Sequence, residues 1–332
     1  MHMADALVST AVAGTMYACS ALATGYSLRK VKADDLNHKI PLMGVMGAFV
    51  FATQMINFTI PGTGSSGHLC GGMLLSAVLG PEAGFLTLAS VLVIQCLMFA
   101  DGGLMALGCN VWNMGFYGCF VGGYLIWNAF MRRGITRGRI VAASLVGCVV
   151  SLLLGAFSVT LETLASGITE LPFSIFAGFM LPIHLVIGLV EGLITAAVLL
   201  FIFQARPQLL RGYGAEAPAR LHTGAVVSIL GATALVIGGF LSLFASAHPD
   251  GLEWSIERVT GSTELEAGSP HLWASQLQEK LALMPDYGFQ AGESEVGTSV
   301  SGIVGGLLVL AVCVLLCLLI KLVKQPKASS SL

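Results

Sequence analysis

The first residues of the chain, Met1-His2-Met3, could bind a transition metal ion. A free amine at Met1, the backbone amide nitrogen of His2 and Nδ1 of the His2 ring can close a five-membered and a six-membered chelate ring around one ion. These three nitrogens lie nearly in a plane, and a fourth would complete a square. Square-planar nitrogen sites suit Ni(II) or Cu(II), whereas zinc sites are typically tetrahedral. A histidine at the second position can also be incidental, so this pattern alone does not establish a site.

A second candidate ligand, His68, ends the glycine-rich stretch Pro61-Gly62-Thr63-Gly64-Ser65-Ser66-Gly67-His68. Glycines allow a loop to fold into membrane depth without bulky side chains, provided that its backbone groups face protein or water. Such a loop would carry His68 to a site inside the molecule, where its ring could supply the fourth nitrogen. The same stretch is equally compatible with a plain helix-capping loop.

The composition indicates which elements must position these residues. Of the 332 residues, 55% are hydrophobic and only 10% are charged, against about 25% charged in an average soluble domain. The apolar residues form long blocks bounded by charged loops, which is typical of membrane-spanning helices. We therefore expect an all-α, polytopic integral membrane protein with about nine transmembrane helices. The candidate segments are 6–28, 40–58, 69–80, 83–100, 111–131, 140–162, 173–205, 222–246 and 301–320.

Segment 69–80 is shorter than the roughly 20 residues that a straight crossing needs. A loop that dips inward with His68 would explain this length, because the helix would then start part-way down the membrane. The eight cysteines form no C-x-x-C pair, which argues against a disulfide framework or a zinc cluster. Cys70 and Cys109, at expected outer helix ends, are the two thiols that could act as soft ligands.

The lysines and arginines set the expected orientation. Fourteen of the 16 gather in polar segments that nine crossings place on one side, and the positive-inside rule makes that side cytoplasmic. The N-terminus would then face outward, in the inner (plasma) membrane of a bacterium or archaeon. No basic residue precedes the first apolar run, so we expect no cleaved signal peptide and a chain that keeps Met1. These basic residues are Arg29, Lys30, Lys32, Lys39, Arg132, Arg133, Arg137, Arg139, Arg206, Arg211, Arg220, Lys321, Lys324 and Lys327.

Two parts are expected, with a boundary near residue 210. Residues 1–210 hold seven of the segments, and residues 211–332 hold two segments that flank the hydrophilic loop 247–300, a small extracytoplasmic domain. This loop carries nine acidic and two basic residues. The negative charge of this loop would concentrate cations near the outer face, or it would simply keep the loop soluble.

His184 and Glu191 lie seven residues apart, and therefore on one face of the seventh segment. Ionisable residues at membrane depth are functional candidates by default. They could couple metal binding to transport, or they could only form hydrogen bonds between helices.

The stretch 42–118 resembles the CbiM/NikM-type cobalt/nickel substrate-binding (M) component of energy-coupling factor transporters. The resemblance continues through Ile183-His184 and Glu191-Gly192-Leu193-Ile194-Thr195, and Pro249-Asp250-Gly251-Leu252-Glu253 resembles the opening motif of the small partner (N) component. It therefore covers nearly the whole chain, as a fusion of both components. Its longest motif is Phe99-Ala100-Asp101-Gly102-Gly103-Leu104-Met105-Ala106-Leu107-Gly108-Cys109-Asn110-Val111-Trp112-Asn113-Met114-Gly115.

The resemblance implies a metal site made by the Met1 amine, the amide and ring of His2, and His68. Met3-Ala4-Asp5 departs from the opening that is usual in this family, which leaves the packing of the N-terminal loop less certain. Asp101, Asn110 and Asn113 could brace the site as partners of the ligands, or they could cap helices. The implied partners are the lipid bilayer, a membrane coupling subunit and cytoplasmic ATPases, with no nucleic acid and no cofactor beyond the substrate metal.

Nickel import is the expected function, and cobalt import for cobalamin biosynthesis is the alternative. The sequence has no G-x-x-x-x-G-K-[ST] motif, so ATP hydrolysis would reside in the partners and the chain itself would not be an enzyme. A secondary carrier is a further alternative. An intramembrane serine protease is the rival of another class, because Gly64-Ser65-Ser66-Gly67 precedes a short helix, but His68 is poorly placed to activate Ser66.

Overall fold

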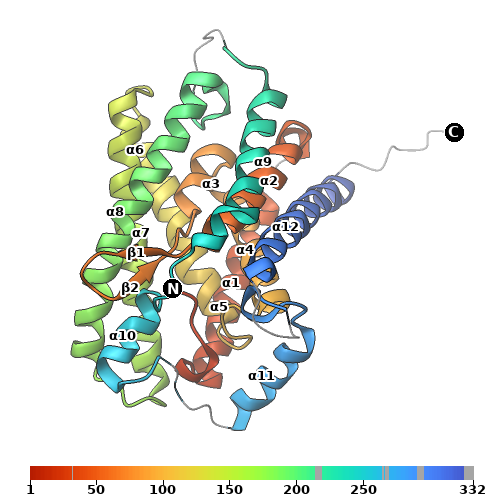
Figure 1. Ribbon diagram of the computed structural model, residues 1–332. Helices are drawn as coiled ribbons and strands as arrows, with labels where there is room; N and C mark the ends of the chain where they lie inside the picture. Colours follow the sequence, from red (N-terminus) through yellow and green to blue (C-terminus); the bar gives the residue numbers. More distant parts are fainter. Residues whose placement is uncertain (32, 214–218, 264, 266–268, 290–294, 325–332) are drawn as a thin grey trace, which may run out of the picture.

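The structure, a computed structural model, describes residues 1–31, 33–213, 219–263, 265, 269–289 and 295–324, and nearly all of their regular structure is helical (Figure 1). The elements are η1 (Asp5–Leu7), α1 (Thr10–Lys30), α2 (Ala33–Gln54), β1 (Phe58–Ile60), β2 (Ser65–Gly67), α3 (Gly72–Leu79), α4 (Pro81–Phe99), α5 (Leu107–Asn110), η2 (Val111–Trp127), α6 (Asn128–Met131), α7 (Arg137–Ser166), α8 (Phe173–Ala205), η3 (Pro207–Leu209), α9 (Thr223–Gly239), η4 (Leu241–Phe244), α10 (Gly251–Thr260), α11 (Ser269–Leu281), η5 (Pro285–Tyr287) and α12 (Glu295–Lys324).

Four helices among the described residues are long and apolar enough to cross a membrane: Pro81–Phe99, Arg137–Ser166, Phe173–Ala205 and Val296–Lys324. Two shorter apolar helices cover Ile40–Gln54 and Thr223–Gly239. The expectation of a helical protein with several membrane-spanning segments is therefore confirmed. The count of nine crossings stays a prediction.

Helix α8 shows how the bundle faces lipid and core. Leu185, Leu189 and Leu193 point outward with 41%, 45% and 58% of their surfaces exposed. Ile183 and Ile187 on the opposite face are buried at 4% and 3% exposure. An outer surface of exposed leucines is stable against lipid tails, because helices satisfy their own backbone groups and present only apolar side chains.

The short helix α3 has eight residues, all of them buried. It follows the hairpin β1–β2, whose strands are antiparallel with Phe58 opposite Gly67. Gly72 of α3 touches Gly118 of η2 backbone to backbone, since a Cβ on Gly118 would lie 2.8 Å from Cα of Gly72. The expected short helix after His68 is thus present, whereas the hairpin was not predicted.

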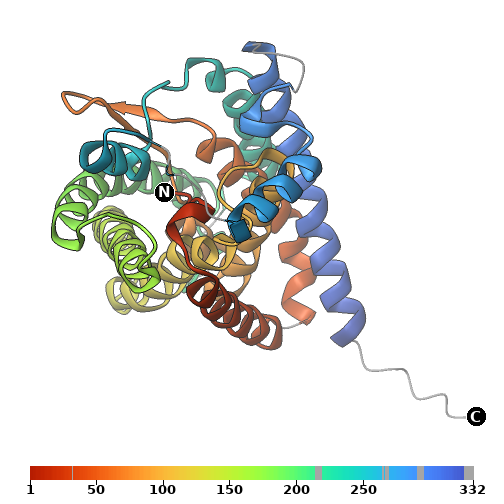
Figure 2. The same ribbon diagram turned by 90° about the horizontal axis from the view of Figure 1, so that it is seen from below.

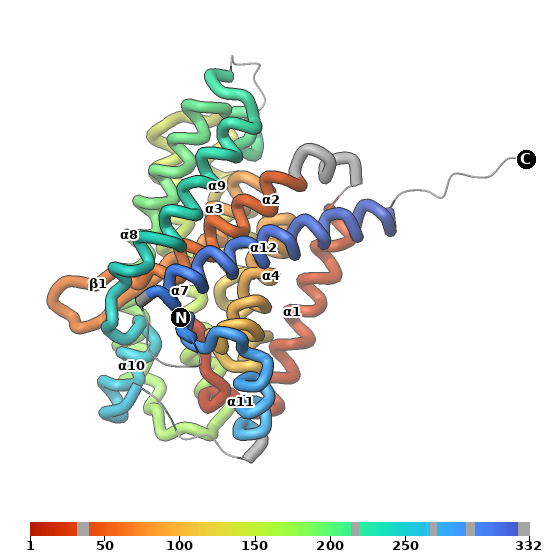
Figure 3. The backbone as a smooth tube through the Cα atoms, turned by 45° about the vertical axis from the view of Figure 1, so that its right-hand side comes forward, coloured from red at the N-terminus to blue at the C-terminus, as the bar shows by residue number. Residues whose placement is uncertain are grey.

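The second part of the chain wraps around the first. Helices α9 and α12 pack on α2, and α12 crosses the bundle obliquely (Figure 3). The helices α10 and α11 of the loop 247–300 lie at the end of the bundle away from the α8–α9 connection (Figure 1). Seen from below, the N-terminus lies inside the ring of helices, between α10 and α11 (Figure 2). The N-terminal residues are therefore enclosed by both parts of the chain.

Candidate metal centre

The N-terminal loop is clamped through the backbone of Met3. The side chain of Asn110 accepts a hydrogen bond from Met3 N at 2.7 Å and donates one to Met3 O at 3.2 Å. The amide of Gly103 donates to the same carbonyl at 2.8 Å. Asn110 thus braces the loop that carries Met1 and His2, and its hydrogen bonds go to the Met3 backbone.

Asp5 fixes the far end of this loop. Its Oδ1 accepts hydrogen bonds from the amides of Met105 and Ala106 at 2.8 and 3.0 Å. Gly103 must lack a side chain, because a Cβ there would overlap the Asp5 carboxylate. The residues that depart from the family's usual opening therefore have well-defined partners in this chain.

The Met1 amine and His68 meet although 67 residues separate them. The amine donates to Nε2 of His68 at 2.8 Å, and both residues are buried. Nδ1 of His68 lies 3.1 Å from the carbonyl of Leu69, to which it donates its proton. Nε2 therefore carries the lone pair. A metal-binding imidazole needs this tautomer when a carbonyl accepts the proton of its other nitrogen. The rings of His2 and His68 stack with centroids 5.1 Å apart.

Helix α8 holds the turn that carries His68. The Glu191 carboxylate accepts the amide protons of Cys70 and Gly71, each at 2.9 Å. Gly67 rests on Ile187, and a Cβ at Gly67 would come within 2.6 Å of the Ile187 side chain. Glu191 therefore anchors the backbone next to a candidate ligand. His184, one turn before Ile187, lines a small cavity together with Met1 and His68.

Asp250 is a member of the centre that the sequence analysis did not select. Its carboxylate forms an ion pair with the Met1 amine and lies 3.7 Å from Nε2 of His68. Its other oxygen caps α10 by accepting the amide protons of Leu252 and Glu253. The available signal was the Pro249–Glu253 motif, whereas the number of acids in this loop predicts only a diffuse negative field. Of these acids, Glu264, Glu266 and Glu293 lie outside the described residues.

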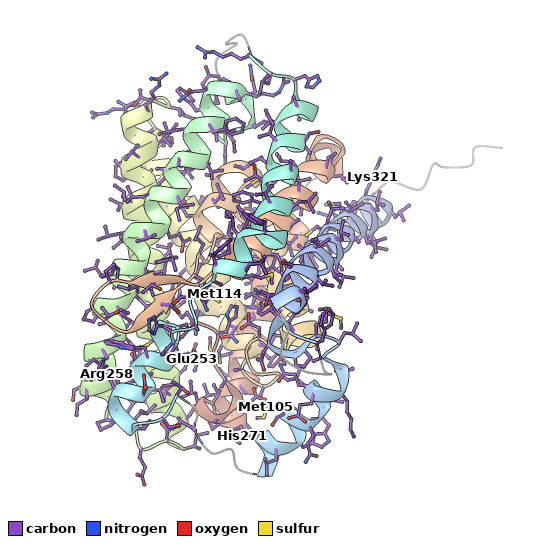
Figure 4. All side chains as sticks on the ribbon, viewed as in Figure 1. Met105, Met114, Glu253, Arg258, His271 and Lys321 are labelled. Carbon is purple, nitrogen blue, oxygen red and sulfur yellow. The ribbon has the colours of Figure 1, made fainter. Side chains whose placement is uncertain are left out.

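The loop before α10 docks directly on the His68 hairpin. The amide of Ser66 donates to the carbonyl of Pro249 at 2.8 Å, and its hydroxyl donates to the carbonyl of His248 at 2.7 Å. The indole of Trp254 and the guanidinium of Arg258 donate to the carbonyl of Thr63. Glu253 and Arg258 can be followed on α10 in Figure 4, at the opposite end of the molecule from Lys321. The Ser66 hydroxyl thus contacts backbone carbonyls, and no described imidazole activates it as a nucleophile.

Burial and charge set the protonation of these groups. Burial lowers the pKa of the Met1 amine, but the Asp250 carboxylate raises it more, so it ends above its usual value of 8.0. Burial alone would raise the pKa of Asp250, yet the charge of the Met1 amine holds that pKa well below its ordinary value. The two groups are therefore an ammonium and a carboxylate at neutral pH.

His2 is oriented by Asp101. Nδ1 of His2 lies 3.1 Å from Oδ1 of Asp101, whose other oxygen accepts a hydrogen bond from Tyr287. Burial lowers the pKa of His2 to about 4, so the ring is neutral and Nδ1 carries the proton that faces Asp101. Nε2 of His2 has no partner among the described residues. Asp101 therefore contacts the same nitrogen that the chelate would use, instead of bracing the ring through its other nitrogen as expected for a supporting residue.

Asn113 lies one step farther from the ligands. Its side-chain amide donates to Glu162 at 2.7 Å and lies 3.7 Å from the sulfur of Met3. Among the described residues, no three His, Cys, Asp or Glu side chains gather as a metal site. The donors at this centre would include a terminal amine and a backbone amide, so the site would not depend on a cluster of side chains.

Comparison with known proteins identifies the family. Residues 2–209 match the model of the cobalt uptake substrate-specific transmembrane region, and residues 224–322 match the PDGLE domain. The chain belongs to the cobalt uptake family. It is a multi-pass nickel/cobalt transport component in which both family domains are present in one polypeptide. The boundary expected near residue 210 falls between the two matches and stays a prediction.

Relatives of the same organisation carry nickel in their names. A putative fused nickel transport protein NikMN of Archaeoglobus fulgidus is 35% identical over 94% of this chain and 96% of its own length. A probable fused nickel transport protein LarMN of Lactiplantibacillus plantarum is 29% identical over 93% of this chain and 95% of its own. The cobalt transport protein CbiM of Geobacter sulfurreducens is 31% identical over 64% of this chain and 62% of its own.

Solved structures agree with this assignment. The crystal structure of a truncated transition metal transporter matches with a TM-score of 0.54 and 28% identity. It covers 61% of this chain and 98% of that chain. Membership of the family thus has support from both sequence and fold.

Proposed function

We propose that this chain is the metal-binding component of an ATP-driven importer of the energy-coupling factor class, with Ni²⁺ as its substrate. The four donors are the Met1 amine, the His2 amide nitrogen, Nδ1 of His2 and Nε2 of His68. The observation that carries the proposal is the 2.8 Å contact between the Met1 amine and Nε2 of His68. It brings together two of the donors, whose residues are 67 positions apart in the sequence.

Metal binding at these nitrogens would leave the net charge of the site unchanged. Before binding, the Met1 ammonium carries one positive charge. After binding, the amine is neutral, the His2 amide nitrogen has lost its proton, and the ion adds two positive charges. Asp250 can therefore act as the counter-ion in both states, which reduces the cost of holding a dication in a buried site.

Loading requires two of the contacts around these nitrogens to break. The amine must leave the Asp250 carboxylate, and Nδ1 of His2 must leave Asp101. The His2 proton must then move to Nε2, so that Nδ1 offers a lone pair to the metal. The two carboxylates thus hold the N-terminus in place until a metal replaces them.

The proposal places the N-terminus outside the cell and the basic loops in the cytoplasm. It requires nine crossings, of which four have helices of sufficient length and hydropathy in the described part of the chain. Residues 1–210 would form the metal-binding domain, and residues 211–332 would act in loading. A coupling subunit and two ATPases would supply the energy, because the sequence has no nucleotide-binding motif.

Cobalt import for cobalamin biosynthesis is the second candidate. It is supported by the family description and by relatives named for cobalt transport. A planar set of nitrogens favours low-spin Ni(II), and nickel stands above cobalt in the general affinity order. The names of the full-length fused relatives also favour nickel.

Reconstitution into vesicles tests the function. The full chain, with an untagged N-terminus, should not concentrate nickel by itself. Added coupling and ATPase subunits should produce ATP-dependent accumulation, with nickel preferred over cobalt when both are supplied at equal concentration. A His68→Gln variant in the same complex should lose this uptake.

Three results would contradict parts of this proposal. Accumulation by the pure chain without ATP would make it a secondary carrier. Preference for cobalt in the competition would select the second candidate. Full uptake by the His68→Gln variant would exclude the four-nitrogen site.

A further inference from the structure

His184 carries a buried nitrogen that the site described above does not use. The side chain is 1% exposed. Its Nδ1–H donates to the carbonyl of Met180 at 2.8 Å. The proton is therefore on Nδ1, and Nε2 carries a free lone pair. Nε2 has no hydrogen-bond partner among the described residues.

This ring lines a small cavity against the metal centre. The cavity has a volume of about 10 Å³, close to that needed for one water-sized particle. Its lining includes Met1, His68, Cys70, Leu152 and His184. Because Nδ1 turns back to its own helix, the ring edge with Cε1 and Nε2 faces away from α8, and Cε1 lies near Gly251. His184 thus lines the same cavity as Met1 and His68, two residues that supply proposed ligands.

Glu191 on the same helix face does not share this property. Both of its oxygens accept backbone amide protons, from Cys70 and Gly71. Its contacts are those of a structural anchor. A buried nitrogen without a partner is costly, and an apolar ring of similar size would fill the space without that cost. The position of His184 is therefore explained better by a ligand than by packing.

We propose that Nε2 of His184 is a transit ligand, which binds the metal transiently as it leaves the four-nitrogen site. This inference rests on the proposed function. A planar four-coordinate ion exchanges its ligands most readily when a fifth donor adds first. The new bond joins Nε2 to the metal without loss of a proton. As the bonds to the His2 amide and the Met1 amine break, each of these nitrogens takes up one proton from water.

One imidazole cannot compete at equilibrium with a chelate of four nitrogens. His184 should therefore affect the rate of nickel exchange and leave the equilibrium affinity nearly unchanged. This separates a transit ligand from both a member of the primary site and a packing residue.

The test compares His184→Phe with His184→Met in the full chain. Phenylalanine fills the space without a donor, while methionine keeps a soft donor of similar size. Equilibrium nickel affinity is measured first, and then the rate of nickel release into excess chelator. His184→Phe should bind within about threefold of the wild type and release nickel at least about tenfold more slowly. His184→Met should restore most of the rate.

His271 provides a matched control, because it is also buried, hydrogen-bonded to a carbonyl, and left with an unpartnered ring nitrogen. It lies on α11, as Figure 4 shows, and is not among the residues lining the cavity. His271→Phe should leave the release rate unchanged. Equal slowing in this control, an unchanged rate in His184→Phe, no rescue by methionine, or a tenfold loss of affinity would each overturn the proposal. Failure of the wild type to bind nickel through His68 would instead refute the proposed function.

Discussion

At the scale of single residues, the proposed metal centre consists of candidate nitrogen donors held by two carboxylates. Asp250 pairs with the Met1 amine, and Asp101 contacts Nδ1 of His2. Each carboxylate contacts a nitrogen that the metal would have to bind. Protons and metal would therefore compete for the same nitrogens, and the nickel affinity should depend on pH.

The pH dependence of nickel affinity follows from the raised pKa of the Met1 amine. Because Asp250 keeps this amine protonated above its ordinary pKa of 8.0, binding at neutral pH should release about two protons, one from the amine and one from the His2 amide. Affinity should rise about 100-fold per pH unit between roughly pH 6 and 8. Titrations with nickel at several pH values measure this slope.

Asp250→Asn is the informative variant for that slope. Without the Asp250 carboxylate, burial is the largest influence on the amine and lowers its pKa, opposed by a smaller effect of Asp101. The amine should then be largely neutral at pH 7, and the slope should fall towards about tenfold per unit. A slope near zero in the wild type would show that neither nitrogen gives up a proton, which is incompatible with the proposed chelate.

At the scale of elements, helix α8 joins the two parts of the chain at the centre. Ile187 contacts Gly67 before His68, and it also contacts Gly251 after Asp250. Both glycines approach so closely that an added Cβ would lie within 3.0 Å of the Ile187 side chain. The turn that carries a proposed ligand and the turn that carries its counter-ion thus share one support.

Glu191→Gln tests the anchoring of the His68 turn. Glutamine keeps one acceptor, but its NH₂ group would face the second backbone amide and leave it unsatisfied. The loss of about 1–2 kcal/mol should weaken nickel binding roughly tenfold through displacement of His68. Glu162→Gln is the matched control, because Glu162 is also buried but contacts the Asn113 side chain. Equal weakening in both variants, or none in Glu191→Gln, would refute the anchoring role.

The sequence is most informative where the chemistry resides in consecutive residues. Met1-His2 predicts a chelate, which stays a prediction, and the glycines before His68 predict a loop that enters the molecule. Asp250 could not be assigned, because its contact with Met1 joins residues 249 positions apart. The tautomer of His2 depends on Asp101, and the hairpin and α10 depend on packing against each other. These features arise from long-range contacts that residue types and spacing do not encode.

At the scale of the whole molecule, the fusion brings the loop of the second part to the centre of the first. The carbonyls of His248 and Pro249 accept hydrogen bonds from Ser66 in the hairpin before His68. Gln278 of α11 donates a hydrogen bond to the carbonyl of Gly102, beside the N-terminal loop. The covalent connection gives this loop a high effective concentration at the site. If the proposed function holds, loading of the metal would therefore require movement at an interface between the two parts.

The most direct test of the account is the nickel affinity of the full chain before and after the substitution His2→Gln. Glutamine is a bulky second residue that keeps the initiator methionine, and it lacks the ring nitrogen that would close the six-membered chelate ring. The account predicts that the native N-terminus binds nickel tightly and that His2→Gln weakens binding at least about 100-fold, or roughly 3 kcal/mol. Nickel binding of equal strength in the two chains would contradict it.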